Sequence, residues 1–408
     1  MRRVVITGIG GITALGDSWS EIESAFRAGR SGVRYMQEWE RYGDMATRLG
    51  APCKHFSTPE HWTRKQMRGM GRVAQLAVRA SELALAEAGL AGSELLADGS
   101  MGVACGSCVG SPPDVVDMAR LLIDNDGSHV NANSYIRMMP HTAAANVGMF
   151  FGLTGRVIPT SSACTSGSQA IGYAFEAIQA GHQLRMLAGG SEELCPTQAK
   201  AFDTLYATST RNEQPATTPR PYDTERDGLV VGEGACMLLL EEHESARARG
   251  ARIHAEILGY ATNSDGAHAT RPEERTMRAV MQLALANARV SVDAVGYVNG
   301  HGTATTQGDI AESRATSAVF GAHMPISSQK SYLGHTLGAC GALEAWFSIE
   351  MMKSRWFTPT LNLDHVDSMC GALDYIRGDG REIDTDIVVS NNFAFGGINT
   401  SLVLKQYS

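Results

Sequence analysis

Four residues in three separate segments are of the types that carry out acyl-transfer chemistry. Cys164 stands in SSACTSGSQA, His301 in VNGHGTATTQGD, and Lys330 and His335 stand together in QKSYLGHTLGACG. A cysteine sulfur is a strong nucleophile, and a neutral histidine can donate a hydrogen bond to a carbonyl oxygen. One cysteine with two histidines and a lysine therefore indicates chemistry on a thioester or a similar acyl group.

Cys164 is predicted to lie where a strand ends and a helix begins. Ile171, Ala174, Phe175 and Ile178 follow it at the spacing of one helix face. Candidate N-cap residues precede this face at Thr165, Ser166 and Ser168. The partial positive charge of a helix N-terminus would stabilise a thiolate, and its free N–H groups could hold an oxyanion. A small buried core thiol is the alternative, and position alone does not decide between the two.

Cys108 is a rival nucleophile, because GSCVG (106–110) has the G-x-nucleophile-x-G spacing of a hydrolase turn. That turn requires a helix immediately afterwards, and Pro112 and Pro113 delay one. We therefore expect Cys108 to line a loop or a cavity. The pair in CGSC (105–108) has no second pair with it, so we expect neither a zinc site nor thioredoxin-like chemistry.

The two histidines lie in glycine-flanked turns after strand-like runs. A predicted helix face follows His335 at Ala339, Ala342, Leu343, Trp346 and Phe347. A histidine near a helix N-terminus is held in its neutral form and can donate a hydrogen bond to a carbonyl oxygen. Either histidine alone could be an ordinary loop residue, but the combination with Cys164 favours a shared site.

Composition excludes several classes of protein. The 408 residues are 43% hydrophobic and 19% charged, with a formal net charge of −8, which indicates a globular chain without an overall nucleic-acid-binding surface. The eight cysteines form no disulfide framework, so we expect reduced thiols. MRRVVITGIGGITALG is too rich in glycine for a signal peptide and reads as a first strand, and no apolar run reaches the ~20 residues of a membrane span. We expect a cytoplasmic protein.

Strand-like and helix-like segments alternate along the chain, which predicts an α/β fold with covered sheets. The strand-like runs are RRVVITGI, SMGVACG, GRVIPTSSA, LRMLAGG, ACMLLLEE, RIHAEILGYA, AVGYVNG, MPISSQ and DIVVSNN. Helices are predicted in SEIESAFRAG, VAQLAVRASELALAEAGL and ERTMRAVMQLALANA. A weak echo of the N-terminus near residue 250 divides the chain into halves 1–250 and 251–408, the first with the cysteine and the second with both histidines.

Five segments together resemble the elongating β-ketoacyl-(acyl carrier protein) synthases of type II fatty acid synthesis. In chain order they are SSACTSGSQAIG, RPYDTERDGLVVGEGA, NGHGTATTQGDIAE, SQKSYLGHTLGACGALEA and SNNFAFGGINTSLVL. The resemblance covers essentially the whole chain. It implies the thiolase fold, in which two duplicated halves form a layered αβαβα arrangement. It also implies a homodimer, or a heterodimer with a related subunit, that works with acyl carrier protein.

The resemblance implies a decarboxylative condensation of an acyl thioester with malonyl-acyl carrier protein in fatty acid biosynthesis. Cys164 would accept the acyl group, and His301 and His335 would donate to the malonyl thioester oxygen as carbon dioxide leaves. No tightly bound cofactor and no catalytic metal is expected, because the acyl carrier protein supplies the phosphopantetheine.

Further roles follow from motif matches. Lys330 would organise the site with Glu312 as its acidic partner, and the N–H groups of Cys164 and Phe395 would form the oxyanion hole. The substrate-binding residues would be Thr303, Thr305, Val109, Leu229 and Phe393. A structural monovalent cation would lie near Asn299, Glu344, Ser390 and Asn391.

Three positions depart from the family pattern. Ala394 and Ile398 stand where members usually have glycine and threonine, and Leu229 replaces a usual phenylalanine beside the site. The catalytic set is intact and the substrate-shaping set is altered, so a specialised synthase of a polyene or polyketide pathway is an alternative.

A basic stripe in HWTRKQMRGMGR is the candidate surface for the acidic carrier protein. Arg64 and Arg68, and Arg68 and Arg72, are spaced four apart, and Lys65 lies beside them. A solvated helix face is the alternative reading of this stripe.

Other members of the superfamily fit the sequence less well. A biosynthetic thiolase would have a second catalytic cysteine where residues 391–397 read NNFAFGG. A chain-initiating synthase would have asparagine in place of His335, and a non-catalytic chain-length-factor subunit would lack Cys164. A cysteine hydrolase would use one histidine and release a free acid.

Overall fold

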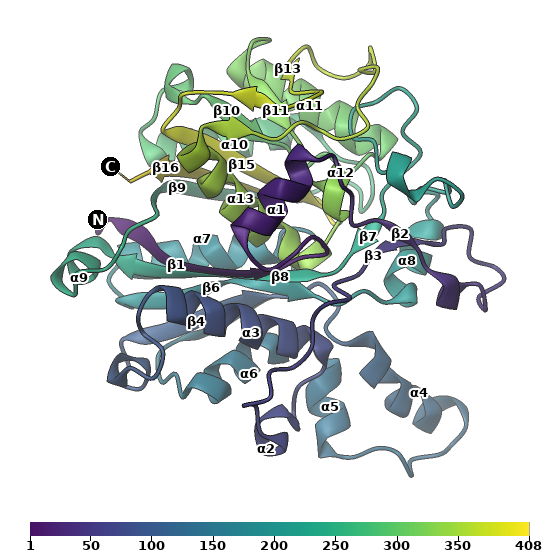
Figure 1. The fold of residues 1–408 in the computed structure, drawn as a ribbon, viewed down its shortest axis with the longest axis vertical. Coiled ribbons are helices and arrows are strands. Elements are labelled where there is room, and N and C mark those ends of the chain that lie inside the picture. The colour runs from purple at the N-terminus through teal and green to yellow at the C-terminus, as the bar shows by residue number, and fades with distance from the viewer. Residues whose placement is uncertain (408) are drawn as a thin grey trace.

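The computed structural model describes residues 1–407, which form one mixed 11-stranded sheet with helices on its faces (Figure 1). One run of neighbouring strands is β1 (Val4–Ile12), β8 (Gly234–Glu242), β6 (Arg185–Glu192), β4 (Met101–Gly106) and β5 (Val157–Thr160). The other run is β9 (Ala255–Ser264), β16 (Ile398–Gln406), β15 (Ile387–Ala394), β10 (Tyr297–Asn299) and β11 (Pro325–Ser327), with β13 (Asp374–Tyr375) at its edge.

The two runs have the same order of strand directions. In the first, β1–β8 and β8–β6 pair antiparallel, whereas β6–β4 and β4–β5 pair parallel. In the second, β9–β16 and β16–β15 pair antiparallel, whereas β15–β10 and β10–β11 pair parallel. Strands β1 and β9 pair antiparallel and join the runs. The repeated order is that of a duplicated fold, and the division at residue 250 stays a prediction.

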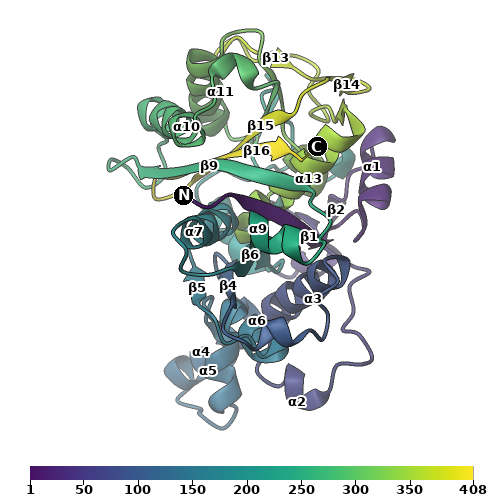
Figure 2. The same ribbon diagram turned by 90° about the vertical axis from the view of Figure 1, so that its left-hand side faces the viewer.

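Two helices lie between the two strand runs and carry the sequence segments of interest. These are α7 (Ser166–Gln179) and α13 (Cys340–Ser354), which contact each other and strands of both runs. Helix α13 is buried almost all round, as its nearly continuous apolar sequence requires. Outer helices α3 (Arg72–Glu87) and α6 (Thr142–Phe151) cover one run, and α10 (Glu274–Ala288) with α11 (Thr306–Phe320) covers the other (Figure 2). The predicted αβαβα layering is confirmed.

Close backbone contact between the layers requires glycine at two positions. A Cβ atom on Gly167 of α7 would lie 2.7 Å from the carbonyl oxygen of Gly338, and one on Gly190 of β6 would lie 2.2 Å from it. The turn before α13 therefore packs directly on β6 and the start of α7. This contact brings the C-terminal half against the segment that carries Cys164.

Smaller elements complete the described chain. The helices are α1 (Trp19–Arg27), α2 (Arg64–Met67), α4 (Val115–Ile123), α5 (Ala132–Met138), α8 (Pro196–Asp203), α9 (His243–Ala248) and α12 (Lys330–Leu333). The short strands are β2 (Arg34–Tyr35), β3 (Leu49–Ala51), β7 (Val231–Gly232), β12 (Trp356–Phe357) and β14 (Arg381–Glu382). Within residues 1–407, none of the helices has the length and apolar character needed to cross a membrane.

Candidate active site

Cys164 lies in the turn between β5 and α7, as the sequence predicts. Its side chain is buried, and Ala163 before it has a positive φ of 51° that turns the chain sharply into the helix. Thr165 occupies the N-cap position, but its hydroxyl donates to the carbonyl of Ser162 at 2.7 Å instead of capping the helix. The first N–H groups of α7 therefore donate no hydrogen bond to the Thr165 side chain.

His335 lies beside the cysteine sulfur, with 2.9 Å between its Nε2 atom and Cys164 Sγ. The backbone N–H of Leu337 donates to His335 Nδ1 at 3.3 Å. Because a backbone N–H can only donate, Nδ1 is the acceptor and the neutral ring carries its proton on Nε2. The ring therefore presents a hydrogen-bond donor to the sulfur and its surroundings.

His301 completes a three-residue cluster. Its ring centre lies 5.1 Å from that of His335, nearly perpendicular to it. The side-chain ligand atoms of both histidines and of Cys164 all lie within 4.8 Å of one another. Asn392 Nδ2 contacts His301 Nδ1 at 3.4 Å and donates to Glu344 Oε2 at 2.6 Å. The carboxylate sets the direction of the amide, so His301 Nδ1 accepts and its proton also lies on Nε2.

Both histidines are held neutral by their surroundings. Burial, with the positive charge of Lys330 in support, lowers the pKa of His301 and of His335 well below its ordinary value. Burial alone would lower the pKa of Lys330, but the Glu344 carboxylate, which its Nζ contacts directly, raises it. Lys330 is therefore a buried cation whose direct contact is Glu344, and the predicted partner Glu312 acts on it through space without a hydrogen bond.

Glu312 has a different place in the site. It accepts hydrogen bonds from the backbone N–H groups of His301 and Gly302, the second at 2.7 Å. One helical turn earlier on α11, Asp309 accepts from the N–H groups of Thr303 at 3.0 Å and Ala304 at 3.1 Å. Two buried carboxylates thus hold four consecutive backbone amides and shape the loop that carries His301.

The sulfur of Cys164 is a neutral thiol at rest. Burial raises its pKa to about 12, although Lys330 and the N–H groups of Phe395 and of Cys164 itself act in the opposite direction. Desolvation therefore outweighs the stabilisation of a thiolate that the helix N-terminus was predicted to give. The N–H groups of Cys164 and Phe395 lie near enough to the sulfur to favour its charged form, and their role as an oxyanion hole stays a prediction.

A cavity of about 280 Å³ opens beside the cluster. Its walls include four of the five predicted substrate-binding residues, which are Thr303, Thr305, Leu229 and Phe393. The hydroxyls of Thr303 and Thr305 lie 2.9 Å apart. The fifth residue, Val109, is 37% exposed and does not line this cavity in the described chain, so its substrate-binding role stays a prediction.

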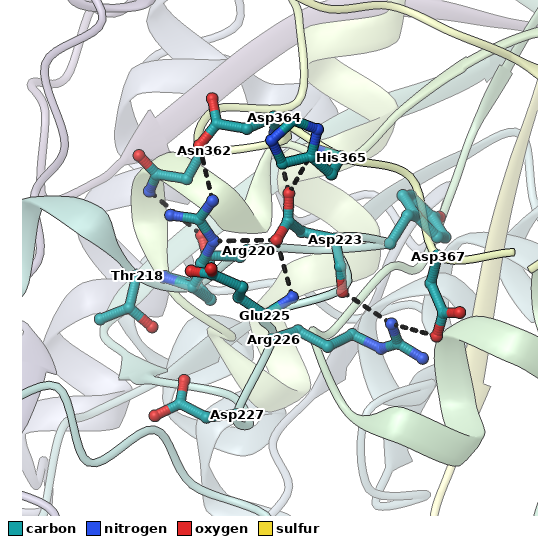
Figure 3. Close-up of polar contacts among 12 residues, drawn as sticks. Thr218, Arg220, Asp223, Glu225, Arg226, Asp227, Asn362, Asp364, His365 and Asp367 are labelled. Atoms are coloured by element: carbon teal, nitrogen blue, oxygen red, sulfur yellow. Dashed lines mark hydrogen bonds and ion pairs between the residues drawn. The ribbon is translucent and has the colours of Figure 1, made fainter.

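A polar network holds the segment that leads to Leu229 (Figure 3). Asp223 accepts from the backbone N–H groups of Asp364 at 2.8 Å and His365 at 2.9 Å. Arg226 donates to Asp367 at 2.8 Å and to the carbonyl of Thr306 at 3.1 Å. The RPYDTERDG motif therefore connects one wall of the cavity to the start of α11. Asp223 and Arg226 make these structural contacts, whereas Asp227 of the same motif lines the cavity.

The comparisons with known proteins agree with this arrangement. Residues 1–246 match the family model "Beta-ketoacyl synthase, N-terminal domain", and residues 254–364 match the corresponding C-terminal domain. The chain belongs to the β-ketoacyl synthase family. The motifs that resemble this family in the sequence come together at the site described above.

Individual relatives cover the whole chain. It is 36% identical to "3-oxoacyl-[acyl-carrier-protein] synthase 2" of Synechocystis over 100% of this chain and 98% of the relative. The crystal structure of a β-ketoacyl synthase from Burkholderia phymatum STM815 is 60% identical, with a TM-score of 0.99 and full coverage of both chains. The ishigamide ketosynthase/chain length factor is 31% identical, with a TM-score of 0.91 and the same full coverage.

The predicted basic stripe of this β-ketoacyl synthase is not one helix face. Helix α2 ends at Met67, and Arg72 begins the separate helix α3. Arg72 is half-buried and its Nε donates to the buried carboxylate of Glu233 at 2.6 Å, so it is not a free surface charge. Arg64, Lys65 and Arg68 are exposed, and these three keep the predicted surface role.

The predicted cation position contains suitable oxygen atoms. The side-chain oxygens of Asn299 and Asn391 are buried and accept no hydrogen bond, and Glu344 lies close to Asn299. Asn299 Nδ2 donates to Ser390 Oγ at 3.3 Å, which turns its oxygen away from that hydroxyl. Unpartnered buried oxygens suit a hard cation, and the cation stays a prediction.

Sequence reasoning missed several residues that organise the site. Asn392 lies inside a recognised motif, but nothing in its neighbourhood marked it as a partner of His301. Asp309 stands three residues before Glu312, and that spacing on a helix was the available signal. Glu344 is an acidic residue within the apolar run of α13, a pattern that indicates a buried partner, although it was considered only for a cation.

Proposed function

We propose that this protein is an elongating β-ketoacyl-acyl carrier protein synthase, which joins an acyl group on Cys164 to malonyl-acyl carrier protein. The observation that carries the proposal is the cluster of one nucleophilic thiol and two neutral imidazoles, both with their protons on Nε2, beside a cavity. Relatives named 3-oxoacyl-acyl carrier protein synthases support it over the full chain length.

The first half-reaction is an acyl transfer. Cys164 sulfur attacks the acyl thioester carbonyl, the bond to the carrier sulfur breaks, and the thiol proton of Cys164 ends on the released carrier thiol. The N–H groups of Cys164 and Phe395 receive the negative oxygen of the tetrahedral intermediate. Because one thioester replaces another, the acyl group keeps its reactivity.

The second half-reaction forms the carbon–carbon bond. Malonyl thioester loses carbon dioxide, and the Nε2–H groups of His301 and His335 donate to the enolate oxygen that develops. The carbanion attacks the acyl carbonyl on Cys164, the carbon–sulfur bond breaks, and the Cys164 thiolate that leaves takes one proton from solvent water. The products are a β-ketoacyl thioester, carbon dioxide and free Cys164.

Mass spectrometry tests both half-reactions. Incubation with an acyl carrier substrate should add one acyl group to Cys164, and malonyl carrier should then remove it and give the β-keto product. Cys164→Ala should abolish loading, whereas Cys370→Ser, a half-buried thiol outside the site, should load normally. His335→Ala should reduce decarboxylation more than loading. Release of free acid without a new carbon–carbon bond would instead support a hydrolase.

Thr303 and Thr305 are proposed to bind the pantetheine arm, because both line the cavity with adjacent hydroxyls. The arm belongs to the carrier protein, which brings the substrate as a phosphopantetheine thioester. Arg64, Lys65 and Arg68 are proposed to bind the acidic carrier by charge complementarity.

Fatty acid biosynthesis is the pathway that the named relatives favour. A specialised polyene or polyketide synthase is the second candidate, and the altered cavity residues Leu229 and Ala394 favour it. A panel of acyl carriers of different length and unsaturation distinguishes them, because a specialised enzyme should prefer unsaturated or aryl starters over saturated chains by at least an order of magnitude.

A second copy of this chain is the proposed subunit partner. Strand β5 pairs with β4 on one side only and ends the sheet, so its other edge has unpaired backbone groups. Ten of the fifteen exposed large hydrophobic residues of the described chain fall between 109 and 157, around this edge. An isologous dimer would cover both features, and a related second subunit is the other outcome. We infer a cytoplasmic location, where the eight free thiols would stay reduced.

A further inference from the structure

Glu192, the last residue of β6, is a fully buried carboxylate that sequence reasoning did not single out. Four hydrogen-bond donors converge on it, and none comes from a cationic side chain. They are the Ser107 hydroxyl and the backbone N–H groups of Cys108, Val109 and Gly338. Burying a carboxylate is energetically unfavourable, and its four hydrogen bonds offset this cost. We therefore look for the function of Glu192 in the backbone segments to which the four donors belong.

The two oxygen atoms of Glu192 accept hydrogen bonds from different segments of the chain. Oε1 accepts from Ser107 Oγ at 3.0 Å and from the Val109 N–H at 3.2 Å, which both belong to the loop after β4. Oε2 accepts from the Cys108 N–H at 2.6 Å and from the Gly338 N–H at 3.0 Å. Oε2 therefore joins two segments that are far apart in the sequence.

Gly338 follows the residue that sets the tautomer of His335. The Leu337 N–H donates to His335 Nδ1, and Leu337 has a positive φ of 45° that an unrestrained turn would tend to leave. A Cβ atom on Gly338 would lie 2.7 Å from the Cys108 nitrogen and 2.8 Å from Glu192 Oε2. The turn at Gly338 therefore packs directly against the Glu192 carboxylate and the loop after β4, and leaves no room for a larger side chain.

We propose that Glu192 is a positioning residue, which through Gly338 holds the turn that keeps the His335 proton on Nε2 for donation to the malonyl thioester. This inference rests on the proposed function and deepens it. Glu192 itself does not touch the reacting atoms. Its effect should therefore fall on the step that uses His335 as a donor, rather than on acyl loading of Cys164.

Each carboxylate oxygen of Glu192 receives two donors. Glutamine has nearly the same shape, but its amide replaces one oxygen by a donor group. With its amide oxygen at the Oε2 position, glutamine still accepts from the Cys108 and Gly338 N–H groups, and its NH2 group can donate to the Ser107 hydroxyl. Glu192→Met has no such acceptor, so it removes the connection with little change in volume.

Glu193 provides a matched control. It is the next residue along the chain, is also buried, and accepts from the Ser111 hydroxyl at 2.7 Å and the Val73 N–H at 3.2 Å. It makes no contact of this kind with the turn after His335. Glu193→Met thus makes the same chemical change in a comparable environment without touching the proposed connection.

The experiment measures two rates on the same preparations. These are acyl loading of Cys164 from an acyl carrier substrate and decarboxylation of malonyl carrier, each divided by the fraction of chains that can be acylated. Glu192→Met should lower decarboxylation about tenfold or more while loading changes less than about threefold, because a misplaced catalytic group slows its own step. Glu193→Met should keep the wild-type ratio, and Glu192→Asp, which retains the carboxylate, should recover part of the loss.

The outcomes separate the two hypotheses. A wild-type protein that neither loads Cys164 nor condenses malonyl carrier refutes the proposed function. Active wild type with an unchanged ratio in Glu192→Met, or with equal losses in Glu192→Met and Glu193→Met, overturns the positioning role. If Glu192→Met does not fold, the same ratio is read in Glu192→Asp, where a fall in decarboxylation alone supports the role and an unchanged ratio refutes it.

Discussion

At the scale of residues, the site combines neutral donors with one buried cation. His301 and His335 each have Nδ1 occupied by a donor, so both carry the proton on Nε2. Lys330 depresses the pKa of both rings and is itself held charged by Glu344. The imidazoles are therefore hydrogen-bond donors at every pH where the protein works, and no prior proton loss is needed.

The first prediction concerns pH. Burial raises the pKa of Glu192 to about 7, so the carboxylate gains a proton as the pH falls through that value and can no longer accept all four donors. The other ionisable groups that face Glu192 do not titrate near pH 7. Burial raises the pKa of Cys105 and Cys164 to about 12 and also raises the pKa of Cys108. Burial lowers the pKa of His335 well below its ordinary value. The condensation rate should therefore fall below about pH 7.

Stopped-assay pH profiles of the condensation rate test this prediction. Glu192→Gln should lose the part of the acidic fall that Glu192 causes, whereas Glu193→Gln should retain the wild-type profile. The rest of the fall belongs to Asp309 and Glu312, which hold the His301 loop and whose pKa burial raises to about 6 and about 8. A profile for Glu192→Gln that overlays the wild-type profile after scaling would assign the fall to another group.

The second prediction concerns Leu229, which lines the cavity and is packed in the same apolar cluster as Cys164. Leu229→Phe adds volume to a cavity wall and should shorten or narrow the space for the acyl chain. We expect kcat/KM for long or rigid acyl carriers to fall about tenfold, with a smaller change for the shortest chains. Competition assays with mixed acyl carriers measure the ratio directly, and an equal fall for all chain lengths would remove Leu229 from the acyl-binding wall.

At the scale of elements, turns rather than helices or strands carry the reacting groups. The turn before α7 holds Cys164, the loop before α11 holds His301, and the turn before α13 holds His335. Each is fixed by polar groups on a neighbouring rigid element, for example Asp309 and Glu312 on α11. The reacting side chains therefore lie on short loops, and the packed helices and strands keep these loops in position.

The third prediction concerns helix α2. Arg64→Glu with Lys65→Glu should weaken binding of the acidic carrier protein, and the difference from wild type should shrink as salt is added. Titration calorimetry at two ionic strengths measures it. Arg247→Glu on α9, which lies away from α2 (Figure 1), is a control that reverses one exposed positive charge elsewhere. Equal affinities of the double variant and wild type at low salt would discard this surface.

At the scale of the whole molecule, the two strand runs place the cysteine from one half against the histidines from the other. The turn at Gly338 packs on Gly167 and Gly190, so the halves cannot separate without opening the site. The sheet is left with an unpaired edge at β5. Helix α6 packs against this strand and also contacts α5, which connects the edge to the exposed apolar region.

The fourth prediction concerns that edge. Val157 on β5 is 48% exposed and Met149 on α6 is 67% exposed. Val157→Lys with Met149→Asp should convert a dimer to a monomer, because charges in a buried apolar interface are strongly unfavourable. Sedimentation velocity measures the change, with Leu283→Asp on α10, 53% exposed, as the control. A wild-type monomer would refute the dimer, and a wild type that assembles only with a second chain would indicate a heterodimer.

Much of the fold followed from local patterns. All nine strand-like runs are strands, because buried β-branched and apolar runs between glycines have few other solutions. The local pattern did not predict strand β16 as a separate element, because the first half of the strand is polar. In the structure this strand is central, since it lies between β15 and β9. Helix α11 was missed because its buried face carries carboxylates and small residues instead of a clear apolar stripe.

The sequence by itself determined the reacting groups, their order and the turns that hold them, since residue type and local periodicity are properties of short segments. Only the tertiary structure decided which charges meet. It placed Lys330 in direct contact with Glu344, bound Arg72 to Glu233, and raised the pKa of the Cys164 thiol by burial. These outcomes depend on burial and on contacts between distant segments, because desolvation and Coulomb energies are set by the three-dimensional environment and not by neighbours in the chain.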